Sequence, residues 1–123
     1  MSPLSPEALQ RLETERNLWV ASARPDGRPH LVPVWFAYQA ERFHFCIQPE
    51  SVKARNLRRN PRVVLALEGG SSPVICEGSA ALLPGPPSQP ILDLFQHKYE
   101  WDLRTESVYT LLVEVTPEKW LVW

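Results

Sequence analysis

The sequence has no long hydrophobic run. No apolar stretch approaches the roughly 20 residues that a membrane-spanning helix requires, and the first residues, MSPLSPEALQRLETER, lack the pattern of a secretory signal peptide. The 123 residues are 44% hydrophobic and 22% charged, which is typical of a globular protein with one core. We therefore expect a single domain over residues 1–123, located in the cytoplasm and without a membrane partner.

Glycine is scarce and scattered. The five glycines form neither a G-x-G-x-x-G turn nor a G-x-x-x-x-G-K-[ST] loop, so the two common glycine-rich phosphate-binding loops are missing. A phosphate site in this chain would have to be built differently.

Metal-binding and nucleophilic motifs are also missing. The two cysteines, Cys46 and Cys76, each lie in an apolar, strand-like run and are interpreted as buried free thiols. The three histidines show no H-x-x-x-H spacing, and no serine lies in a nucleophile-elbow pattern. Glu68, Glu77 and Glu114 are expected on polar strand faces rather than as an acid–base pair. The sequence thus predicts no metal site and no catalytic side chain.

Positive charge gathers in one segment, although the formal net charge is only −1. Five basic residues and no acidic one lie between positions 51 and 67: Lys53, Arg55, Arg58, Arg59 and Arg62. The remainder of the chain keeps eight basic residues against 14 acidic ones. A near-neutral chain argues against a dedicated nucleic-acid-binding protein, so we do not expect nucleic acid as a partner.

The basic segment contains a predicted helix start. Ser51 is the expected N-cap, and Asn60-Pro61 ends the helix because the residue before proline avoids helical angles. Lys53 falls in the first turn, where the helix dipole disfavours a cation by about 0.3–1 kcal/mol unless an anion is bound. The Ser51 hydroxyl, the Lys53 ammonium and the Asn56 amide could converge on one phosphate. A solvated basic helix is the alternative, and the spacing alone leaves both open.

Strand patterns dominate the rest of the chain. A short helix is predicted over about residues 5–15, a second one over 51–60 and a third over 91–101. Strands are predicted at residues 17–23, 30–38, 43–47, 62–68, 74–83 and 107–117, with residues 118–123 continuing the last strand or turning back as a seventh. The first three strands follow one another through short turns and predict an antiparallel meander. The expected fold is mainly β, a small antiparallel barrel.

The second predicted strand is unusual because Pro33 lies at its middle. Proline cannot donate to a ladder, so this strand should be an edge strand, bulged or locally unpaired. Trp35 follows on the same strand and could flank a flat aromatic cofactor. The other four tryptophans are expected in the core and at a dimer interface.

Four stretches together carry a family resemblance: DGRPHLVPVWF, FHFCIQPESVKARNLRRNPRVVLAL, VICEGSAAL and VEVTPEKWLVW. Their most specific part is S-x-K-x-x-N-L-x-x-N-P. Over about residues 15–123 the chain resembles the pyridoxamine 5′-phosphate oxidase-like, FMN-binding split-barrel superfamily. The resemblance implies a six- to seven-stranded antiparallel split β-barrel with two or three short helices. It also implies a homodimer with two flavin sites at the subunit interface.

The resemblance further implies a set of cofactor-binding residues: Val32, Pro33, Val34, Trp35, Ile47, Gln48, Ser51, Lys53 and Asn56. Lys53 would hold the flavin phosphate, helped by Ser51 and Asn56. The backbone of residues 32–35 would run along the isoalloxazine ring, and residues 47 and 48 would line the ribityl chain. An aromatic residue of the partner subunit, Trp101 or Trp120, would close the site.

Three positions depart from the flavin-binding oxidases of this group. His30 stands where those proteins carry arginine, Trp35 where they carry lysine, and Val52 where they carry a second basic residue. The C-terminal substrate-phosphate elements of true pyridoxamine phosphate oxidases have no counterpart here, so we do not expect oxidation of vitamin B6.

The resemblance therefore predicts a homodimeric, FMN-dependent oxidoreductase acting on a small molecule. The alternatives are a reductase that uses a deazaflavin coenzyme, and a non-catalytic FMN carrier or stress sensor. A third is a cofactor-free module whose basic helix binds an acidic partner or nucleic acid.

Overall fold

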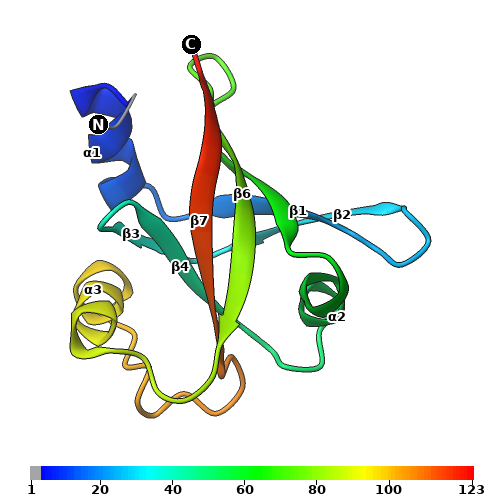
Figure 1. Ribbon diagram of the computed structural model, residues 1–123. Helices are drawn as coiled ribbons and strands as arrows, with labels where there is room; N and C mark the ends of the chain where they lie inside the picture. Colours follow the sequence, from blue (N-terminus) through cyan, green and yellow to red (C-terminus); the bar gives the residue numbers. More distant parts are fainter. Residues whose placement is uncertain (1–3) are drawn as a thin grey trace.

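Seven antiparallel strands form one curled, half-barrel sheet in the computed structural model, which describes residues 4–123 (Figure 1). The elements along the chain are α1 (Pro6–Thr14), β1 (Leu18–Ala23), β2 (Pro29–Val34), β3 (Ala37–Gln39), β4 (Arg42–Ile47), α2 (Val52–Arg59), β5 (Arg62–Leu67), β6 (Val74–Leu83), α3 (Gln89–Tyr99) and β7 (Leu111–Val122). The strand order across the sheet is β2-β1-β5-β6-β7-β4-β3. The predicted mainly β split-barrel class is confirmed, with seven strands and three helices.

The single strand predicted at residues 30–38 is wrong, because the chain leaves the sheet between β2 and β3. At this break the backbone of Phe36 bonds to α3 instead of to a neighbouring strand. Its N–H donates to the Tyr99 hydroxyl at 3.0 Å, and its carbonyl accepts from the Lys98 ammonium at 3.1 Å. A buried backbone group needs a partner, and α3 supplies it here.

The predicted three-strand meander is also wrong. β2 pairs with β1, whereas β3 pairs with β4 at the opposite edge of the sheet. The chain therefore crosses the molecule at Trp35 and Phe36. Of the three arrangements predicted for the strand that contains Pro33 (edge, bulged or locally unpaired), the structure shows the edge position, because β2 is the terminal strand of the sheet. Pro33 lies opposite Trp19 of β1.

The C-terminal strand is one continuous element. β7 begins at Leu111 rather than at residue 107 and pairs with β6 from Leu112 to Val122, so residues 118–122 continue the last strand and do not turn back. The register slips between Glu77 and Gly78. A Cβ atom at Gly78 would lie 2.7 Å from the carbonyl oxygen of Thr116. Glycine at this position allows the two strands to approach.

Two apolar clusters fill the molecule. The larger lies inside the curled sheet, where α1 buries Ala8 and Leu12, and the smaller lies between the sheet and α3 around Phe95. Figure 1 shows α1 and α3 on one side of β7, and α2 on the other. No helix within residues 4–123 is long and apolar enough to cross a membrane. This arrangement places the start of α2 opposite the segment that follows α3.

Candidate functional site

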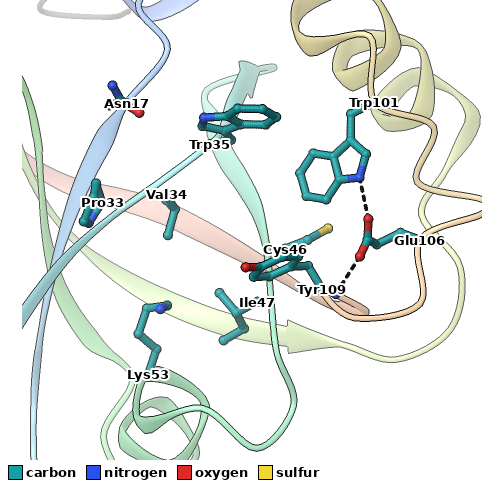
Figure 2. A pocket seen from close by; sticks show the side chains of 10 residues that line it. All are labelled: Asn17, Pro33, Val34, Trp35, Cys46, Ile47, Lys53, Trp101, Glu106 and Tyr109. Atoms are coloured by element: carbon teal, nitrogen blue, oxygen red, sulfur yellow. Dashed lines mark hydrogen bonds between the residues drawn. The ribbon is translucent and has the colours of Figure 1, made fainter.

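A cleft of about 580 Å³ lies between the ends of β2 and β4, the start of α2 and the segment after α3 (Figure 2). It is lined by Asn17, Pro33, Val34, Trp35, Cys46, Ile47, Lys53, Trp101, Glu106 and Tyr109. The volume is within the range of about 300–1,000 Å³ that is typical of small-molecule sites. Five of the nine predicted cofactor-binding residues are in this lining, and they come from β2 and the residue that follows it, from β4 and from α2.

One end of the cleft is basic. Ser51 caps α2, with its hydroxyl accepting the N–H of Ala54 at 3.2 Å, so Lys53 lies in the first turn as the sequence predicts. That turn contains no acidic residue. Lys53 is half-buried, its side chain has no hydrogen bond or ion pair with the rest of the described chain, and burial lowers its pKa. An unpaired ammonium at a helix N-terminus is suited to an anion.

Ser51 and Asn56, the other two residues predicted to hold the phosphate, both have hydrogen-bond partners inside the protein. The Asn56 side chain is 1% exposed and donates to the Ser22 hydroxyl at 3.1 Å, which joins α2 to β1. The Ser51 hydroxyl is engaged as the cap. Of the three predicted residues, Lys53 is the one that lines the cleft. The phosphate roles of Ser51 and Asn56 stay predictions.

Two further predicted residues lie beside the cleft rather than in its lining. Val32 is half-buried and lies opposite Val20 of β1, and Gln48 is exposed just after β4. Their assignment to the cofactor also stays a prediction.

His30 lies near the basic end, on β2 opposite Ser22. Its Nδ1 atom is buried and has no hydrogen-bond partner within residues 4–123. Burial lowers the pKa of this imidazole, and the positive charges of Arg24 and Lys53 lower it further. His30 is therefore neutral at pH 7. The flavin-binding oxidases that the chain resembles carry a charged arginine at this position.

The opposite end of the cleft is aromatic. Trp35 is 44% exposed, and its indole stacks on the Tyr99 ring with centroids 4.5 Å apart and an angle of 11°. The Trp101 ring meets Trp35 edge-on at 5.8 Å. The Arg16 guanidinium lies 4.7 Å from the Tyr99 ring centroid and 5.4 Å from that of Trp35. These contacts fix the orientation of an exposed tryptophan, which offers a flat apolar surface.

Glu106 lies beside Trp101 and Tyr109 at this end of the cleft and is hydrogen-bonded to both (Figure 2). Its carboxylate accepts the indole N–H of Trp101 at 2.7 Å and the backbone N–H groups of Val108 and Tyr109 at 3.0 Å each. These hydrogen bonds, that of Tyr109 first, lower the pKa of the carboxyl group. Glu106 is therefore ionised at neutral pH.

Both cysteines are buried and free, as the sequence predicts. Cys46 also lines the cleft, and burial raises the pKa of its thiol to about 12. The thiol keeps its proton at neutral pH and is a poor nucleophile. The described part of the chain contains no group of three or more potential metal ligands.

The segment after α3 contributes side chains that the sequence did not predict for this chain's own cleft: Trp101, Glu106 and Tyr109 line it together with Lys53. That Trp101 or Trp120 of the partner subunit closes the site stays a prediction. Trp120 lies elsewhere and packs on Tyr38 and Phe43. No local motif identifies Glu106, because its role depends on how the segment folds back on α3.

Comparisons with known proteins agree with this fold. The family model described as pyridoxamine 5′-phosphate oxidase matches residues 4–123. Among solved structures, one titled F420 reductase has a TM-score of 0.77 and 24% identity, and the match covers 98% of both chains. HutZ, titled a heme storage protein from Vibrio cholerae, has a TM-score of 0.81 and 18% identity over 98% of this chain and 95% of that one.

A putative pyridoxamine 5′-phosphate oxidase from Listeria innocua has a TM-score of 0.72 and 19% identity, with 94% of both chains covered. None of the curated proteins matches this sequence. The structural similarities, at these identities, concern the fold alone. The family match covers nearly the whole chain, and the chain therefore belongs to the pyridoxamine 5′-phosphate oxidase family.

Proposed function

We propose that this protein is a homodimeric, flavin-dependent oxidoreductase that binds FMN in the cleft of Figure 2 and acts on a small molecule. The observation that carries the proposal is the position of Lys53. It is an unpaired, half-buried cation at a helix N-terminus, and it lies at one end of a cleft whose other end is aromatic. A ligand with a phosphate at one end and a flat ring system at the other fits this distribution.

The chain's own residues would bind and orient the cofactor. Lys53 would neutralise the phosphate, and Val34 and Ile47 would exclude water from the middle of the cleft. Trp35 and Trp101 would border the ring system. Bound FMN would supply the hydride or electron transfer, so the protein needs only to position it in a dry site.

The homodimer in this proposal is supported by an apolar row on the outer face of the sheet. Leu31 of β2 and Val64 of β5 both lie opposite Ala21 of β1, so the three residues lie side by side. Leu31 is 60% exposed and Val64 is 40% exposed. Burial of such a row against a second copy would remove apolar surface from water.

The first test is the absorbance spectrum of the freshly purified protein, followed by titration with FMN. Bound flavin should give a yellow protein, and added FMN should raise the melting temperature because it binds the native state. A colourless protein whose melting temperature responds to neither FMN nor a deazaflavin coenzyme would contradict the proposal.

A deazaflavin coenzyme is the second candidate. The similarity to a structure titled F420 reductase supports it. So does His30, because the flavin-binding oxidases that the chain resembles carry arginine at this position. Parallel titrations with FMN and with the deazaflavin would give the two dissociation constants, and the tighter ligand identifies the cofactor. If FMN binds tightly but no turnover occurs with NAD(P)H, quinones or nitroaromatic acceptors, a carrier or sensor role replaces the enzymatic one.

A further inference from the structure

A single carboxylate ties together the segment at the aromatic end of the cleft. One oxygen of Glu106 accepts from the Trp101 indole at 2.7 Å, and the other accepts from the N–H groups of Val108 and Tyr109 at 3.0 Å. The three donors come from both ends of segment 101–109, so the carboxylate closes this segment into a ring. Hydrogen bonds to an ionised group are the stronger kind.

The closed segment fixes two aromatic side chains that line the cleft. The Trp101 ring lies edge-on to Phe95 at 5.6 Å and to Tyr109 at 6.3 Å, in addition to its contact with Trp35. Val108 and Tyr109 are exposed, so few apolar contacts hold their part of the segment. The orientation of Trp101 and Tyr109 relative to each other therefore depends on Glu106.

We propose that Glu106 is a positioning residue for the ring end of the bound cofactor. Its carboxylate keeps Trp101 and Tyr109 in place as a preformed wall, and the ligand then need not order these side chains when it binds. Glu106 acts through the two aromatic residues and not by contact with the cofactor. This inference rests on the proposed flavin-binding function.

The test uses Glu106→Gln with two ligands, FMN and riboflavin, which lacks the phosphate. Glutamine has nearly the same shape, but its NH₂ group must face either the Trp101 indole N–H or the two backbone N–H groups, so one end of the network is lost. We expect binding of both flavins to weaken about tenfold, since the ring end is common to both. Lys53→Met should weaken FMN binding and leave riboflavin binding unchanged.

A second readout follows the network without any ligand. The indole N–H of Trp101 gives its own signal in a ¹⁵N-correlated NMR spectrum, and in Glu106→Gln this signal should shift and exchange faster with solvent. Glu118→Gln is the matched control, because Glu118 is exposed on β7 outside the cleft. It should change neither the Trp101 signal nor the flavin affinities.

If Glu106→Gln does not fold, Trp101→Phe provides the same test, because it keeps an aromatic ring but removes the indole donor. It should also weaken both flavins. Unchanged affinity for both flavins in the folded variants would overturn the inference, as would a loss confined to FMN or an unmoved Trp101 signal. If the unmodified protein binds neither flavin, the proposed function itself fails, and the inference fails with it.

Discussion

Replacing Lys53 with methionine should have opposite effects on folding and on binding. Without a ligand, the ammonium is half-buried, unpaired and beside the positive end of the α2 dipole. A cation in that position is unfavourable by about 0.3–1 kcal/mol. Methionine keeps most of the aliphatic stem, so packing should change little. We therefore expect the ligand-free variant to be more stable than the unmodified protein by about 0.3–1 kcal/mol.

In the complex with FMN the same change should be costly. A hydrogen bond to a charged group contributes about 1.5–3 kcal/mol, so FMN binding should weaken roughly 10- to 150-fold. Urea denaturation gives the first quantity, and quenching of flavin fluorescence on titration gives the second. Both measurements should be made at low ionic strength, where the screening of charges by salt is weakest.

The matched control is Arg55→Met, which removes one positive charge from the same helix at an exposed position outside the cleft. It should leave FMN affinity within about twofold, because an exposed charge is screened by solvent. The reasoning fails if Lys53→Met binds FMN as tightly as the unmodified protein. It also fails if both variants lose affinity equally, since the effect would then be one of general charge.

Three further changes test other parts of the structure. Gly78→Ala should destabilise the protein by about 1–3 kcal/mol in urea denaturation, because the new Cβ would lie 2.7 Å from the backbone oxygen of Thr116; an unchanged midpoint would contradict the geometry of the β6–β7 slip. Leu31→Glu should give a monomer in sedimentation velocity at concentrations where the unmodified protein is dimeric, and a persistent dimer would place the interface elsewhere. Burial and the nearby Arg16 charge lower the pKa of Lys98 from 10.5 to about 8. Between these values the unfolded state holds a proton that the native state lacks, so the contribution of Lys98 to stability should increase from pH 8 to pH 10.5. The free energy of unfolding of the unmodified protein minus that of Lys98→Met should therefore rise over this range, and a constant or falling difference would refute it.

The parts of the fold that depend on neighbouring residues could be predicted from the sequence. The helix start at Ser51 is an example, because a capping hydroxyl and the N–H that it accepts lie three residues apart. That the strand with Pro33 is an edge strand, bulged or locally unpaired follows from the missing N–H of proline, which is a property of that residue alone; the sheet order decides for the edge position. The break at Phe36 could not be predicted, since its hydrogen-bond partners are Tyr99 and Lys98, more than 60 positions away.

The candidate site, like the fold, has parts that the sequence predicts and parts that only the tertiary structure shows. By itself, the sequence determined that a lysine lies in the first turn of a capped helix after an apolar strand, and that a tryptophan stands two positions after the proline of a strand. Only the tertiary structure decided that Trp101, Glu106 and Tyr109 complete the cleft and that the Asn56 amide is bound to Ser22. The physical reason is that capping and strand propensity act over a few residues. The walls of a cleft are set by the packing of α3 on the sheet, which brings together residues with no relation in sequence.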